Sequence, residues 1–303
     1  MAGPSFRAAP VRVRVPATSA NLGPGFDSLG LALALYDDVV VRIADSGLHV
    51  DVAGEGAEDL PRDKRHLVVR AVRAAFDALG GQPRGLEVVC ANRIPQGRGL
   101  GSSAAAIVAG ITAARHLVLG GMTDHDALAL AVALEGHPDN VAAALLGGLT
   151  VAWSGATDVR ATRIGLHPDL CAVVLVPNSR SSTAKARRML PETVPHADAA
   201  WSAGRAALLV EAVSRTPDLL FDATEDVLHQ PYRAEAMPRT AALLRSLRGK
   251  GVAAAISGAG PSLIALGVSP GELDAVAAGA PRGWTAQRLD IDRNGAQAVP
   301  VGG

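Results

Sequence analysis

The chain has 303 residues, of which 49% are hydrophobic and 19% are charged, enough apolar material for one large domain or two ordinary ones. Lysine plus arginine equals aspartate plus glutamate at 29 each, so no net charge attracts nucleic acid or an anionic lipid surface. Aromatic residues make up only 3%, which leaves few rings to stack on bases. We therefore expect no nucleic-acid partner.

The distribution of apolar residues and cysteines bears on the compartment. The longest apolar runs, 104–114 and 127–134, are shorter than the ~20 residues that a membrane span requires, and the N-terminal residues carry no apolar signal core. The two cysteines, Cys90 and Cys171, cannot form a disulfide framework. We expect a cytoplasmic protein with no membrane partner.

Strand-like and helix-like patterns alternate along the chain. Period-two patterns and short apolar runs predict strands at 11–15, 31–43, 48–52, 86–94, 149–153, 170–176, 252–256, 262–266 and 284–290. Helical spacing predicts helices at 64–79, 102–119, 123–135, 182–190, 197–213, 217–228, 233–248 and 270–278. Residues 154–167 carry the weakest pattern and are interpreted as a linker. These patterns predict an α+β fold with two domains, residues 1–155 and 156–303.

The strongest chemical signal is the segment IPQGRGLGSSAAA at 94–106. A predicted strand ends at a proline, three glycines alternate, and two serines open an apolar helix. Glycines let the backbone approach a ligand, and the amides and dipole of a helix start attract an anion. The segment lacks the lysine of a Walker A loop and the third glycine of a dinucleotide-binding loop. It predicts a phosphate site, and a glycine-rich turn without a ligand is the alternative.

Four segments in order carry a resemblance to a known family. They are PATSANLGPGFDSLG at 16–30, the glycine segment, EGHPDNVA at 135–142 and SGAGPS at 257–262. Together they resemble the homoserine kinases among the GHMP small-molecule kinases. The resemblance implies a first domain like one found in a small-subunit ribosomal protein and a ferredoxin-like second domain. It also implies ATP-dependent phosphorylation of the L-homoserine hydroxyl, a step toward threonine.

The resemblance also implies roles for individual residues. The ATP phosphates and Mg²⁺ are assigned to the glycine segment, with Ser103 and Glu135 as the metal ligands. One departure is His66-Leu67-Val68, where many relatives have Asn-Leu-Val and contact adenine. The expected ATP-binding residues are Pro95, Gln96, Gly97, Arg98, Gly99, Leu100, Gly101, Ser102, Ser103, Ala104 and Ala105. The expected homoserine-binding residues are Asn21, Asp27, His137, Thr183, Arg187, Arg233 and Gly260.

Three residues are expected to be catalytic: Glu135, Asn140 and Arg187. A neutral asparagine cannot accept a proton at pH 7, so we expect Asn140 to orient the hydroxyl without acting as a base. Each segment also has a plain structural interpretation, because Gly/Pro turns and solvated helix-end charges are common.

Two functional alternatives stay open: another GHMP kinase with a different small alcohol such as mevalonate, and a nucleotide-binding regulator without catalysis. The expected partners are L-homoserine and ATP. Relatives are often dimers, which makes a homodimer an expectation that no residue of this sequence establishes.

Overall fold

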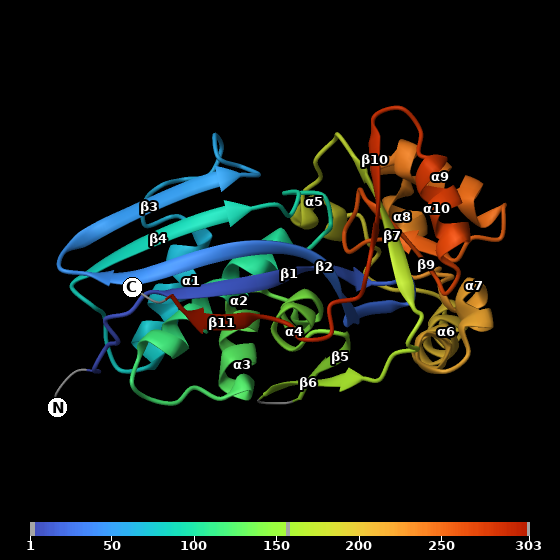
Figure 1. Cartoon of the computed structure of the whole chain (residues 1–303). Coiled ribbons are helices and arrows are strands. Elements are labelled where there is room, and N and C mark those ends of the chain that lie inside the picture. The colour runs from blue at the N-terminus through green and yellow to red at the C-terminus, as the bar shows by residue number, and fades with distance from the viewer. Residues whose placement is uncertain (1–3, 156–157, 302–303) are drawn as a thin grey trace.

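The computed structural model describes residues 4–155 and 158–301, which form two β-sheets with helices packed against them (Figure 1). In the larger sheet, strands run in the order β11-β1-β2-β4-β3, and β5 and β6 join it through β2. All its pairings are antiparallel except that of β3 with β4. Its strands are β1 (Val11–Asn21), β2 (Gly25–Ala44), β3 (Gly47–Gly54), β4 (Gly85–Asn92), β5 (Leu149–Ser154), β6 (Val159–Ile164) and β11 (Gln297–Pro300).

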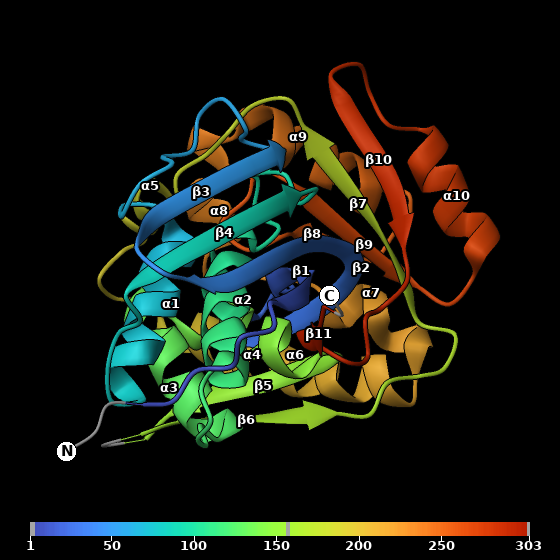
Figure 2. The same cartoon turned by 60° about the vertical axis from the view of Figure 1, so that its left-hand side comes forward.

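Four helices accompany the larger sheet: α1 (Leu67–Ala78), α2 (Ser102–Leu117), α3 (Asp124–Glu135) and α4 (Pro138–Leu146). Figure 2 shows α1, α2 and α3 beneath the strands β3 and β4. Helix α2 is central, because it packs against α1, α3, α4 and β1. Its alanine-rich sequence is buried on nearly every side, as expected for a helix that lies inside a core. The buried helix fixes the position of the glycine segment that precedes it.

The smaller sheet has the strand order β10-β7-β9-β8. The chain passes through this unit as strand, helices, strand, strand, helix, strand, which is the ferredoxin-like arrangement, so the expected second fold is confirmed. Its strands are β7 (Cys171–Pro177), β8 (Ala254–Ile256), β9 (Leu263–Gly267) and β10 (Trp284–Leu289). Its helices are α5 (Thr183–Arg187), α6 (His196–Ser214), α7 (Leu220–Ala223), α8 (Gln230–Arg233), α9 (Pro238–Arg248) and α10 (Pro270–Ala278), with 3₁₀ turns at Pro217–Leu219 and Ala234–Ala236.

Four expectations about local structure are wrong. The predicted helix 233–248 is interrupted at Met237, between a 3₁₀ turn and α9. The predicted linker contains β6, an edge strand without a buried side chain, so its sequence lacks the apolar alternation that marks a strand. Helix α4 was not predicted, although Gly136 caps α3 and Pro138 opens α4. The helix is short and buried on nearly every side, so its sequence shows no polar face that would mark a helical period. The predicted helix 217–228 is a 3₁₀ turn followed by the short α7. The division at residue 155 stays a prediction, although β6 and β11 both pair in the first sheet.

No helix in residues 4–155 and 158–301 combines the length and the hydrophobicity of a membrane span.

Candidate active site

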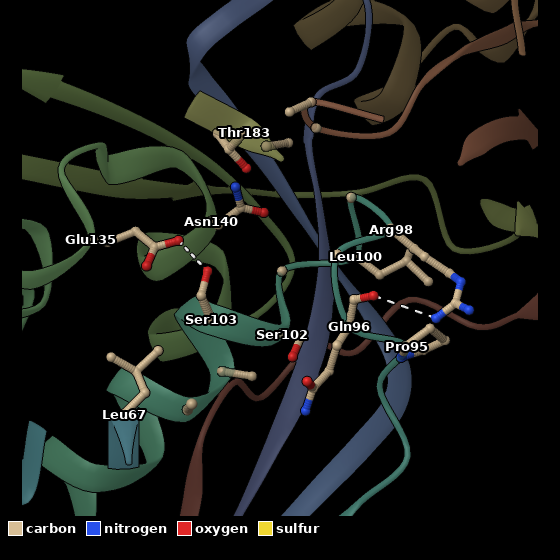
Figure 3. A pocket seen from close by; sticks show the side chains of 18 of the residues that line it. Leu67, Pro95, Gln96, Arg98, Leu100, Ser102, Ser103, Glu135, Asn140 and Thr183 are labelled. Carbon is tan, nitrogen blue, oxygen red and sulfur yellow. Dashed lines mark hydrogen bonds between the residues drawn. The ribbon is translucent and has the colours of Figure 1, made fainter. Parts of the chain in front are cut away.

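A cavity of about 310 Å³ lies where the glycine segment, the start of α2 and the 21–27 loop meet (Figure 3). It brings together most of the predicted site residues, from both parts of the chain. Ala104, Arg233 and Gly260 do not line it. The predicted residues that do are Asn21, Asp27, Pro95, Gln96, Gly97, Arg98, Gly99, Leu100, Gly101, Ser102, Ser103, Ala105, Glu135, His137, Asn140, Thr183 and Arg187.

The glycine segment forms an open cradle at the start of α2. Gly101 is the residue before the helix and has φ +68°, a left-handed conformation that favours glycine. A Cβ there would overlap the hydroxyl of Thr18. Among the described residues, no side chain caps the helix. Its first amides are thus available to an anion, which the helix dipole also favours.

Contacts with the second part of the chain hold the cradle in place. Arg98 Nε donates to the carbonyl of Pro177 at 2.9 Å, and the amide of Ser181 donates to the carbonyl of Gly97 at 2.8 Å. The 257–262 segment lies directly behind the cradle, since Ser257 Oγ donates to the carbonyl of Gly99 at 2.6 Å. The predicted residue Gly260 belongs to this supporting segment.

Ser103 and Glu135 place two oxygen ligands beside the cradle. Ser103 Oγ donates to Glu135 Oε1 at 2.6 Å, and Figure 3 shows the two side chains pointing toward each other. A hydroxyl and a carboxylate are oxygen donors of the kind that Mg²⁺ prefers, and Mg²⁺ commonly takes one or two protein ligands together with phosphates and water. The described residues contain no group of three or more His, Cys, Asp or Glu side chains that could hold a metal. The pair therefore fits a magnesium ion shared with a phosphate ligand.

The 21–27 loop, which comprises the last residue of β1, the connection to β2 and the first residues of β2, has a strained backbone. Asn21, Leu22 and Asp27 all have positive φ, at 68°, 50° and 55°, which is uncommon for residues other than glycine. The amide of Asn21 offsets this cost with two bonds: Nδ2 donates to the carbonyl of Gly258 at 2.9 Å, and Oδ1 accepts from the backbone amide of Asp27 at 3.0 Å. Such strain persists where surrounding contacts impose it, and it concentrates at functional sites.

Asp27 forms a forked ion pair with Arg187 on α5. Arg187 NH1 donates to Asp27 Oδ2 at 2.9 Å and NH2 to Oδ1 at 2.5 Å. The hydrogen bond to Asp27 raises the pKa of Arg187. Both side chains keep about a third of their surface exposed, 34% and 38%, and both line the cavity. One negative and one positive group therefore stand side by side in reach of a ligand.

Arg233 lies behind this pair. Arg233 is 2% exposed, and its burial lowers the pKa of the guanidinium. Its NH1 donates to the carbonyl of Gly258 at 3.2 Å. The Phe26 ring is next to both arginines, with its centroid 5.5 Å from Arg233 Cζ and 5.6 Å from Arg187 Cζ.

At the start of α4, three neighbouring side chains bond to one another. Asn140 Oδ1 accepts from Thr18 Oγ1 at 2.8 Å, and the Asn140 backbone amide donates to Asp139 Oδ1 at 2.8 Å. His137 Nδ1 is 3.0 Å from the same Asp139 oxygen, and this bond raises the pKa of His137. Asp139 is 2% exposed and lines the cavity. Sequence reasoning missed it, although it stands between His137 and Asn140 in a segment that was singled out.

At the other end of the cavity, apolar side chains surround two buried titratable groups. His66 is 3% exposed, and neither ring nitrogen has a partner among the described residues. Burial lowers its pKa. Asp37 Oδ1 accepts the backbone amides of Arg93 and Ile94 at 2.6 and 2.9 Å, and burial raises the pKa of Asp37 to about 6. Asp37 was not predicted as a site residue, because nothing in its strand sequence distinguishes it.

Models of two domain families match the chain. GHMP kinases N terminal domain matches residues 66–148, and GHMP kinases C terminal matches residues 205–285. Homoserine kinase of Streptomyces avermitilis is 61% identical over 99% of both chains, and that of Streptomyces coelicolor is 62% identical over 99% of this chain and 98% of the relative.

Solved structures agree with these matches. A crystal structure of homoserine kinase from Cytophaga hutchinsonii has a TM-score of 0.87 and 26% identity, and the match covers 99% of this chain and all of that chain. Mevalonate kinase from L. major, crystallised with R-mevalonate, has a TM-score of 0.73 and 19% identity over 97% of this chain and all of that one, so it shares the fold. The chain belongs to the GHMP kinases, and within them to the homoserine kinase family.

Proposed function

We propose that the protein transfers the γ-phosphoryl group of ATP to the side-chain hydroxyl of L-homoserine, giving O-phospho-L-homoserine for threonine biosynthesis in the cytoplasm. The observation that carries the proposal is one cavity with two unlike ends. An uncapped helix start with the Ser103–Glu135 pair lies at one end, and the exposed Asp27–Arg187 pair lies at the other. The names of the two Streptomyces relatives, both homoserine kinases, support the choice of acceptor.

The nucleotide is proposed to bind along the glycine segment. Its phosphate oxygens would accept hydrogen bonds from the backbone amides of the cradle and of the first turn of α2, as anions do at helix starts. The base would then lie at the apolar end, between Val15, Val39 and Leu67. His66 and Asp37 offer the polar atoms there. An unpaired buried imidazole costs free energy, which a hydrogen bond from the nucleotide would offset.

Ser103 and Glu135 are the residues proposed to hold Mg²⁺. The ion, when bound, supplies charge neutralisation on the phosphate oxygens. The protein's own part is to keep the hydroxyl and the carboxylate together, which the buried helix α2 and the end of α3 already do.

The acceptor is proposed to bind by exchanging partners with the Asp27–Arg187 pair. A zwitterionic amino acid carries an ammonium for Asp27 and a carboxylate for the planar Arg187 fork, which binds carboxylates with two parallel bonds. The substrate's charges thus replace bonds that the two side chains already make, which limits the cost of desolvation.

In the transfer step, the bond between the γ-phosphorus and the β–γ bridging oxygen of ATP breaks, and a bond from phosphorus to the homoserine oxygen forms. ADP leaves with the bridging oxygen, and the hydroxyl proton passes to phosphate or solvent. Asn140 is proposed to orient the hydroxyl. Its amide is held by Thr18 on one side and by Asp139 on the other, and such positioning is the main requirement of phosphoryl transfer.

A coupled ADP-release assay tests the proposal. The purified protein is incubated with ATP and Mg²⁺ and with L-homoserine, mevalonate or galactose, and phosphorylated products are identified by mass spectrometry. We expect turnover with homoserine to exceed that with the other alcohols. A preference for mevalonate or galactose would establish a different kinase, and tight ATP binding without any ADP release would establish a regulator. Gel filtration with light scattering tests the expected homodimer.

A further inference from the structure

His229 is a buried histidine that the proposed phosphoryl transfer does not use. It is the residue before α8 and is 0% exposed. The carboxylate of Asp226 accepts the backbone amides of Leu228, His229 and Gln230 at 2.9, 3.0 and 2.7 Å, which fixes the backbone that carries the imidazole. The ring therefore has one defined position in the core.

Both ring nitrogens of His229 bond to parts of the acceptor end. Arg233 NH1 is 3.1 Å from Nδ1, and Nε2 is 2.8 Å from the carbonyl oxygen of Gly23. A guanidinium can only donate, so Nδ1 accepts and Nε2 carries the proton that it donates to Gly23. This is a neutral tautomer, and burial, which lowers the pKa of His229, favours it.

The two bonds join elements from distant parts of the sequence. Gly23 belongs to the strained loop that ends in Asp27, and Arg233 closes α8 in the second part of the chain. Phe26 of the same loop lies against the imidazole, with ring centroids 5.2 Å apart. Arg233 NH1 also reaches Gly258, whose carbonyl oxygen accepts from Asn21. The imidazole is thus the bridge between the loop and the buried arginine.

We propose that His229 is a positioning residue that holds the 21–27 loop and Arg233 in one arrangement and thereby sets the affinity for the amino-acid acceptor. Within the described part of the chain, its ring hydrogen bonds go to Gly23 and Arg233 and not to the cradle or the Ser103–Glu135 pair. The proposal rests on the proposed function, because it treats the Asp27–Arg187 end as the acceptor site. The proposal predicts that substitutions of His229 change KM for homoserine and leave KM for ATP unchanged.

Three variants separate the two bonds. His229→Phe keeps a ring against Phe26 but removes both nitrogens. His229→Gln keeps a donor for Gly23, and His229→Asn keeps an acceptor for Arg233. His229→Phe leaves the buried Arg233 guanidinium and the Gly23 carbonyl without the imidazole as a partner, so we expect it to raise KM for homoserine about tenfold or more. We expect each conservative variant to recover part of that change, and KM for ATP to stay within about twofold, because the cradle is untouched.

The control is Leu247→Ala, which removes a buried side chain from the core of the second sheet, away from the cavity. It is expected to lower Tm without changing either KM. An unchanged homoserine KM in folded His229→Phe, or equal rises in both KM values, overturns the proposal. Failure of all three variants to fold also overturns it, because the role is then structural. Absence of homoserine phosphorylation by the wild-type protein instead overturns the proposed function.

Discussion

The two ends of the cavity solve the problem of binding charge in different ways. At the phosphate end, the positive potential comes from backbone amides and a helix start, and the cradle holds no lysine. At the acceptor end, full charges on Asp27 and Arg187 meet in a fork, with a second arginine buried behind them. A backbone site depends on conformation, whereas a side-chain site depends on which atoms the side chain carries. We therefore expect the phosphate end to be sensitive to substitutions that change the backbone conformation, and the acceptor end to be sensitive to substitutions that change the side-chain atoms.

The largest expected effect is at the phosphate end. Glu135→Ala should lower kcat about 10²-fold or more, the scale of losing one preorganised charge contact. The measurement is steady-state turnover with saturating homoserine and ATP over a range of Mg²⁺ concentrations. Glu211→Ala is the matched control, because Glu211 is an acid in the last turn of α6, outside the cavity. A loss of thermal stability with unchanged kcat would make Glu135 a structural residue.

A pair of glycine variants tests whether the phosphate end depends on backbone conformation. Gly97 and Gly101 have nearly the same φ, +64° and +68°, but a Cβ at Gly97 stays 3.4 Å from its nearest neighbour, whereas one at Gly101 overlaps Thr18. Both alanine variants should lose about 1 kcal/mol to left-handed strain. Gly101→Ala should lose roughly 2 kcal/mol more to crowding and bind ATP more weakly.

Denaturant unfolding and ATP titration calorimetry measure both quantities for the glycine pair. If the free energy of unfolding falls equally in the two variants, the close packing of Gly101 against Thr18 does not contribute to stability.

At the acceptor end, the shape of the charged group should matter as well as its sign. Arg187→Lys keeps a positive charge but cannot form two parallel bonds with a carboxylate, so we expect KM for homoserine to rise about tenfold and KM for ATP to stay unchanged. Arg188→Lys, at the exposed neighbouring position, is the control. An unchanged homoserine KM in the first variant would remove Arg187 from the acceptor site.

The same contrast explains what the sequence predicts and what it does not. The cradle is predictable because its glycines, serines and helix start are contiguous, so their spacing reveals the conformation they need. The resemblance of the whole 16–30 segment identified Asn21 and Asp27, but nothing local predicts that Asp27 meets Arg187, 160 residues away along the chain. Arg233 is buried behind the cavity lining and bonded to His229, and its expected contact with substrate stays a prediction.

Residues without a local signal were missed for the same reason. Thr18, Asp37 and Asp139 acquire their roles from what packs against them, namely Asn140, the amides of Arg93 and Ile94, and His137. In the fold, long amphipathic or apolar elements such as α1 and α2 were predicted within a few residues. The exposed strand β6 and the buried helix α4 were missed because pattern reasoning depends on contrast between an apolar and a polar face, which neither element shows.

The smallest expected effect concerns Asp37, a buried carboxyl group in the apolar part of the cavity. Burial raises its pKa from 3.8 to about 6, so between these values the folded state holds a proton that the unfolded state has released. Stability should therefore fall as pH rises from about 4 to 6 and stay lower above pH 6. Asp37→Asn keeps an oxygen for the amides of Arg93 and Ile94 but cannot ionise, so it should remove this dependence. Relative to wild type, the variant should be more stable at pH 7 than at pH 4, by on the order of 1 kcal/mol.

Urea unfolding of both proteins at pH 4, 5, 6 and 7, without ATP, measures the difference. Parallel pH profiles would mean that the Asp37 carboxyl ionises normally, and that its surroundings do not favour the neutral form as the apolar lining of this part of the cavity implies.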